Sequence, residues 1–97
     1  MAQTMLLDGV TVSGASTNTF TVSDSYATVI AEDLTANDEV LIEKQDIAGT
    51  GWLPYSPTGL DIYLTFKISE VNILGKGTYR VNLQNDPQAA ISVVSEI

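Results

Sequence analysis

Hydrophobic and polar residues alternate along several stretches of the chain, and the longest regular stretch covers residues 60–69. An alternation with a period of two predicts a β-strand with one buried and one exposed face. We therefore expect a ten-residue strand at this position. The residues of its predicted buried face are Leu60, Ile62, Leu64, Phe66 and Ile68.

Shorter stretches with the same period are separated by turn-forming residues such as Gly, Asn, Asp and Pro. A helix is not expected, because Thr28, Val29 and Ile30 are β-branched in succession, and at most one short turn is expected near residues 34–37. The pattern predicts a single all-β domain, residues 1–97, folded as an antiparallel β-sandwich (Ig-like or jelly-roll-like) or a flattened barrel. Its seven to eight strands are predicted at residues 5–13, 18–22, 27–32, 39–47, 60–69, 71–74, 78–83 and 89–95.

The chain of 97 residues contains no cysteine, so disulfide bonds cannot stabilise it. A single core of this size gives modest stability, and small domains without disulfides or metals commonly gain stability by association. We therefore expect a homo-oligomer or a many-copy assembly.

The net charge is −8, and only four basic residues oppose the twelve acidic ones. Such a charge repels phosphate backbones, so nucleic acid is not an expected partner. The sequence also has no long apolar segment and no basic, apolar leader at its start. We expect neither a membrane partner nor export through the general secretory route.

Histidine and cysteine are both absent, which excludes the Ser-His-Asp and Cys-His arrangements that activate a nucleophile. The usual ligands of zinc and copper are therefore also missing. Asp33, Asp38 and Glu39 lie close together in the sequence, but their spacing fits turn formation better than a calcium loop. We predict a non-enzymatic protein with no catalytic residue, no metal and no cofactor, although a pair of carboxylates remains formally possible.

The segment 51–57 contains the only tryptophan of the chain and two of its three prolines. Proline stiffens a loop, and Trp and Tyr are frequent in interface hot spots. Trp52, Pro54 and Tyr55 are therefore candidate partner-binding residues. In an alternative interpretation, Trp52 fills the open end of the sandwich between the two sheets.

Some strands carry apolar residues on both of their predicted faces. Leu41 lies between Val40 and Ile42, and Val94 follows Val93; Ile30 likewise follows a valine. Apolar residues on an outer face indicate that a partner covers it, so Leu41 and Val94 are further candidate partner-binding residues. A local bulge that changes the register is the alternative explanation.

The segments EVLIE at residues 39–43, GTGWLP at 49–54 and GTYRVNL at 77–83 resemble a pattern in small structural proteins of bacteriophage particles. In those proteins a hairpin ending in a tryptophan is followed by a strand with a Tyr-Arg-Val-Asn core. The opening strand is also similar at residues 5–7 and 10–16. This chain departs from the pattern before Trp52, where Ala48 and Gly49 replace an Asp-Gly pair.

The resemblance implies a virion structural protein, assembled in the host cytoplasm, whose partners are other viral structural proteins. The first expectation is a capsid decoration or cement protein bound to the major capsid protein, and the second is a neck, tail or fibre component. A different class of function is a carbohydrate-binding adhesion module, in which Trp52, Tyr55 and Tyr63 would stack on sugars.

Overall fold

The computed structural model describes residues 3–97, in which ten strands form two antiparallel sheets and no helix occurs. The predicted all-β, two-sheet antiparallel architecture is therefore confirmed. In the first sheet the order is β1 (Gln3–Val10), β10 (Ile91–Glu96), β4 (Ala27–Glu32) and β8 (Glu70–Ile73). The main path of the second sheet is β2 (Gly14–Ala15), β9 (Gly77–Leu83), β5 (Val40–Gln45) and β6 (Trp52–Pro54), with β3 (Phe20–Val22) beside β9 and β7 (Tyr63–Leu64) beside β5.

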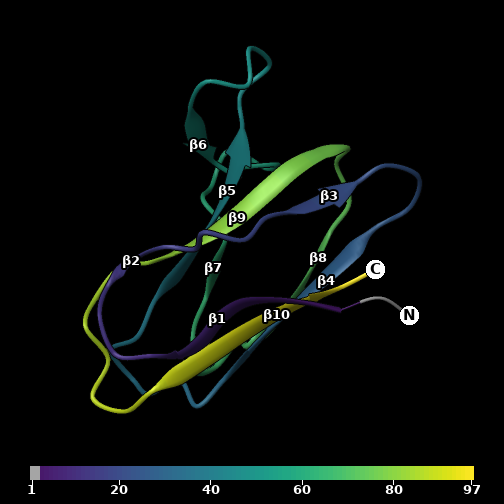
Figure 1. Cartoon of the computed structure of the whole chain (residues 1–97). Helices are drawn as coiled ribbons and strands as arrows, with labels where there is room; N and C mark the ends of the chain where they lie inside the picture. The colour runs from purple at the N-terminus through teal and green to yellow at the C-terminus, as the bar shows by residue number, and fades with distance from the viewer. Residues whose placement is uncertain (1–2) are drawn as a thin grey trace.

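The six strands of the second sheet occupy only four positions across its width. β2 and β3 pair with different parts of β9, and β6 and β7 pair with different parts of β5. Figure 1 shows this sheet lying over the first one, with β9 in one layer and β10 in the other. The two ends of the described chain lie side by side, because Gln3 pairs with Glu96.

The core lies between the two layers and is filled by residues that alternate along the strands. Val29, Ile42 and Val81 are completely buried, and residues of this type suit a pleated, half-buried surface. Tyr79 is the largest fully buried side chain, with its ring 5.4 Å from those of both Phe20 and Tyr55. Its hydroxyl donates a hydrogen bond of 2.6 Å to the carbonyl oxygen of Gly75.

The alternation at residues 60–69 predicted a ten-residue strand, and this prediction is wrong. Only Tyr63 and Leu64 form a strand, because the chain turns there to cross to the other sheet. The amide of Thr65 donates to the carbonyl oxygen of Ile68, which closes the turn, and Ser69 then accepts a hydrogen bond from Ala31 of β4. Phe66 and Ile68 in this turn are consequently exposed, and Leu60, which precedes β7, is exposed as well.

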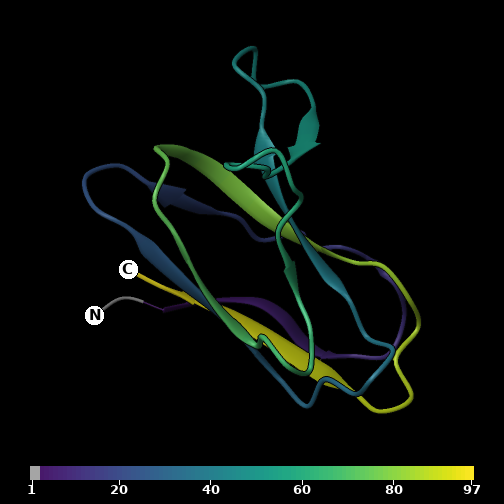
Figure 2. The same cartoon turned by 180° about the vertical axis from the view of Figure 1, so that it is seen from behind.

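The predicted number of seven to eight strands is too low. The strand predicted at residues 5–13 corresponds to β1 and ends at Val10, and β2 lies outside every predicted strand. Residues 52–54, which were expected to be a loop, form the strand β6. This strand pairs with β5 through three residue pairs, of which Gln45 and Trp52 form the outermost. The β5–β6 hairpin extends beyond the body of the sandwich, as Figure 2 shows from behind.

Candidate functional site

The end of the β5–β6 hairpin, residues 45–54, is named the hairpin arm here. Its turn is held by Asp46, whose amide donates to the carbonyl oxygen of Gly51 and whose side chain accepts a hydrogen bond of 2.9 Å from the amide of Thr50. The amide of Gly49 donates to the carbonyl oxygen of Asp46, and Gly49 has a φ of 74°, which favours glycine. The arm is therefore an ordered turn.

The hydrogen bond from the Thr50 amide, together with the amides of Gly51 and Gly49, holds the pKa of Asp46 below its usual value although burial acts in the opposite direction. This carboxylate satisfies donors of its own turn. Asp46 therefore has a structural role in shaping the tip of the arm.

Two apolar side chains of the hairpin arm face solvent. Ile47 at the tip is fully exposed, and Leu53 on β6 is 60% exposed. No charged residue occurs at positions 47–57, although the chain as a whole carries a net charge of −8. Interface centres are depleted of charged residues, so this surface has the composition of a protein contact.

Trp52 lies on the outer face of the second sheet, so the interpretation that it fills the end of the sandwich is wrong. The guanidinium carbon of Arg80 lies 4.5 Å from the centre of its ring, within the range of a cation–π contact. Arg80 Nε in turn donates a hydrogen bond of 2.7 Å to Glu43 Oε1, and Asn82 Nδ2 lies 3.4 Å from the same oxygen. One face of the Trp52 indole ring is therefore covered by the Arg80 side chain.

Replacing Arg80 with Ala is expected to lower the free energy of unfolding by about 1–3 kcal/mol, because the mostly buried carboxylate of Glu43 loses its cation. The change also uncovers Trp52, whose fluorescence is specific because it is the only tryptophan. Acrylamide quenching should therefore increase in Arg80→Ala and remain unchanged in Lys76→Ala, which removes an exposed cation. Equal quenching in the two variants would contradict the stacking contact.

Pro54 and Tyr55 point to opposite faces of the second sheet. Pro54 is exposed and pairs with Glu43 on the outer face. Tyr55 packs against the core, and its ring is perpendicular to that of Tyr79. Trp52 and Tyr55 therefore cannot form the common stacking platform expected for a carbohydrate-binding module.

The other two candidates, Leu41 and Val94, both lie on outer faces. The registers of β4 with β8, of β5 with β9 and of β10 with β4 are continuous, so β4, β5 and β10 themselves carry no bulge. The register of β10 with β1 is interrupted, because β1 has an extra residue opposite Val93 and Val94. Leu41 is nevertheless only 7% exposed, beside Tyr63 and Asn82 of the neighbouring strands, and it offers a partner little surface. Val94 is partly exposed on the outer face of the first sheet.

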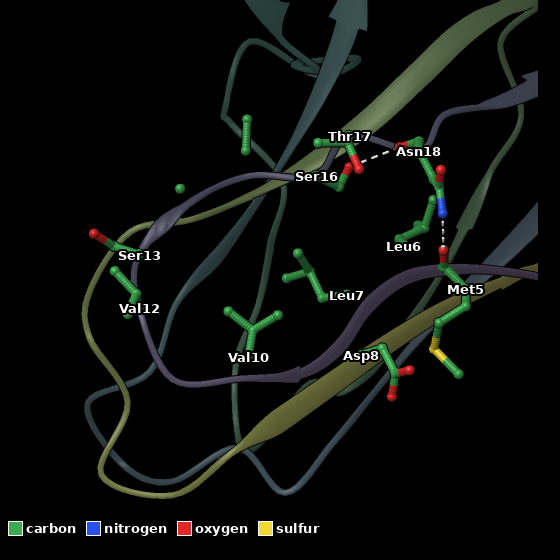
Figure 3. Close-up of a pocket in the computed structure, with 12 residues that line it drawn as sticks. Met5, Leu6, Leu7, Asp8, Val10, Val12, Ser13, Ser16, Thr17 and Asn18 are labelled. Atoms are coloured by element: carbon green, nitrogen blue, oxygen red, sulfur yellow. Dashed lines mark hydrogen bonds between the residues drawn. The ribbon is translucent and has the colours of Figure 1, made fainter.

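The bulge lies in β1, which also lines a cleft of about 490 Å³ together with the β2–β3 segment. Figure 3 shows Leu6 and Leu7 on one side of β1, with Met5 and Asp8 on the other. At the mouth of the cleft, the side-chain amide of Asn18 donates a hydrogen bond of 2.8 Å to the carbonyl oxygen of Met5. Asp8 is the one ionisable residue among those that line the cleft.

The acidic residues near position 38 form a turn, as predicted. Asp38 accepts hydrogen bonds from the amide and hydroxyl of Thr35 and from the side-chain amide of Asn85. Among residues 3–97, no group of three potential metal-ligating side chains is present. None of the elements described is a helix long and apolar enough to cross a membrane.

The sequence interpretation did not select Ile47 and Leu53, the two exposed apolar residues of the hairpin arm. A signal was present, because residues 47–57 form an uncharged stretch of an acidic chain and include the turn residues Gly49 and Gly51, although residues 9–23 are uncharged as well. The aromatic and proline residues of segment 51–57 instead indicated Tyr55 as a contact residue, but Tyr55 packs against the core.

The fold and the hairpin arm define an antiparallel two-sheet β-sandwich with a projecting hairpin. Comparison of the chain with models of protein families, with curated proteins and with solved structures finds no match in any of the three.

Proposed function

We propose that this chain is a non-enzymatic structural protein of a bacteriophage particle and that it binds the assembled shell as a decoration subunit through the hairpin arm. The observation that carries this proposal is the ordered arm, uncharged from residue 47 onward, with the exposed side chains of Ile47 and Leu53. The sequence resemblance to virion proteins supports the choice of partner. The protein then resides in the virion after assembly in the host cytoplasm.

A protein contact fits the arm better than a sugar contact. A stacking platform needs several aromatic faces side by side, but Trp52 is covered by Arg80 and Tyr55 belongs to the core. Tyr63 lies on the same outer face as Trp52, but it pairs with Leu41, four positions along β5 from the residue that pairs with Trp52. Exposed aliphatic side chains around a rigid turn can instead enter an apolar pocket of a partner at low entropic cost. Binding only to the assembled shell stabilises the assembled state by mass action.

The first test is whether the chain sediments with particles from its source in a density gradient, measured by quantitative mass spectrometry. A decoration protein is expected at many copies per particle, whereas a few copies would indicate a neck, tail or fibre component. Absence from the particles would overturn the virion proposal.

The second test removes the two exposed apolar side chains of the arm in the double variant Ile47→Ser/Leu53→Ser. We expect its affinity for particles to fall at least tenfold, equivalent to about 1.4 kcal/mol, because exposed apolar anchors are typical hot spots. The matched control is Val12→Ser/Ile68→Ser, which removes two exposed apolar side chains outside the arm. Wild-type affinity of the arm variant would show that the contact lies elsewhere.

A further inference from the structure

The outer face of the first sheet carries an apolar row that crosses three strands. Met5 of β1 pairs with Val94 of β10, and Val94 pairs with Ile30 of β4. Directly paired residues lie on the same face of a sheet with their side chains in contact range. Met5 is 43% exposed, and Val94 and Ile30 are partly exposed, so the row is open to solvent. The exposed face of an antiparallel sheet is normally polar, and this row departs from that rule.

Carboxylates surround the row. Glu70 of β8 pairs with Ile30 and continues the row at the edge of the sheet, whereas Glu96 and Glu32 lie on the same face two positions from Val94 and Ile30. The four strands of this sheet contain no lysine or arginine. Within residues 3–97, the one ion pair formed by a basic residue joins Arg80 to Glu43 in the other sheet. Among these described residues, the three glutamates therefore have no basic side chain as a partner.

A pocket of about 330 Å³ opens over β4 at one end of the row. Thr28 and Ile30 line it together with Tyr26 and Ile97, which are 50% and 53% exposed. Glu96 and Glu70 also line it, and they come from the strands on either side of β4. A long cationic side chain suits such a pocket, because its aliphatic stem packs on apolar walls and its charged end pairs with carboxylates.

We propose that this face, named the acidic face, is a docking surface for a protein partner whose contact surface is apolar at its centre and basic at its rim. A lysine or arginine of that partner occupies the pocket between Glu70 and Glu96. A second copy of the chain does not fit, because two acidic faces would bring like charges together. The inference rests on the proposed function, since a subunit that bridges neighbouring shell proteins needs a contact surface in addition to the hairpin arm.

The test uses the isotope-labelled full chain in an NMR titration with an amphipathic helical peptide made of Leu and Lys. We expect shifts of the amide signals of Tyr26, Ile30, Glu70, Val94 and Ile97, with no comparable shifts in the hairpin arm. A peptide in which Glu replaces every Lys should not bind. Equal binding of the two peptides, or shifts centred elsewhere, would overturn the proposal.

The double variant Glu70→Gln/Glu96→Gln should bind the Lys peptide at least fivefold more weakly than the wild type. The control Glu39→Gln/Asp86→Asn removes the same charge from loops outside this sheet and should retain most of the affinity. Equal losses of affinity in the two variants would show that only the net charge matters, and they would contradict binding of a basic side chain in the pocket. Because no particle is needed, failure of this titration is distinguishable from absence of the chain from virions.

Discussion

Tyr79→Ala is expected to lower the free energy of unfolding by about 3–5 kcal/mol, the range observed when a large buried aromatic side chain is truncated. Tyr79 is completely buried, and its ring connects Phe20 of β3 with Tyr55 beside β6. The truncation leaves a cavity between three segments of the second sheet. Small domains are stable by only about 5–15 kcal/mol, so urea denaturation should show a large shift of the midpoint.

The variant Tyr79→Phe keeps the ring and removes only the hydroxyl, so it separates the contribution of the hydroxyl to stability from that of the ring. Burial, with a smaller effect of Tyr55, raises the pKa of Tyr79 to about 12, so the hydroxyl keeps the proton that it donates to Gly75 over the working pH range. Losing this single hydrogen bond should cost about 1 kcal/mol. A loss below 1 kcal/mol in Tyr79→Ala itself would contradict the central position of the ring in the core.

Asp38→Ala is expected to destabilise the protein by about 1.5–3 kcal/mol, because the charged side chain accepts three hydrogen bonds. These bonds join the β4–β5 connection, through Thr35, to the β9–β10 connection, through Asn85. Asn85 in turn accepts a hydrogen bond of 3.0 Å from the amide of Glu39. The substitution therefore leaves donors in two connections without their acceptor.

The exchange Asp38→Asn/Asn85→Asp provides the matched control, since it can keep every hydrogen bond of this network with the charge moved to the other residue. The single variant Asp38→Asn instead places two amide groups, both donors, against each other. We expect the double variant to recover most of the stability lost in the single one, as measured in a double-mutant cycle. Purely additive losses would disprove the direct contact.

Stability should also depend on pH through Asp38. Burial would raise the pKa of Asp38, but the hydrogen bonds from Thr35 and Asn85 more than offset it and hold the value below normal. A carboxyl with a lowered pKa in the folded state stabilises the protein above its unfolded pKa, near 4, and loses this contribution as the pH falls through the folded value. Acid titrations should therefore show a smaller loss of stability in Asp38→Ala than in the wild type.

Local sequence patterns predicted several strands well. Residues 27–32 form β4 as predicted, because successive β-branched residues favour a pleated strand and their alternation directs Val29 to the core. Residues 77–83 form β9, within one residue of the prediction, with Tyr79, Val81 and Leu83 buried. In both strands the local preference and the burial pattern agree.

The alternation at residues 60–69 shows which information a hydrophobic pattern does not contain. It states which side chains can be buried together, but it does not state where the chain leaves one sheet for the other. The hydrogen bonds of Thr65 and Ile68 form that crossing, and they place Phe66 and Ile68 outside the core. Only the pairing of distant strands decides this point.

For the candidate site, too, some features follow from the sequence and others only from the tertiary structure. The sequence alone determined the all-β class, the acidic charge and the uncharged segment that contains Trp52. The tertiary structure decided which of its side chains face a partner, because the register of β6 on β5 turns Trp52 outward and a shift by one residue would reverse every face. It also decided the acidic face, where Met5, Ile30 and Val94 come together from strands far apart in the sequence. Pairings of this kind depend on long-range packing, which composition and local periodicity do not encode.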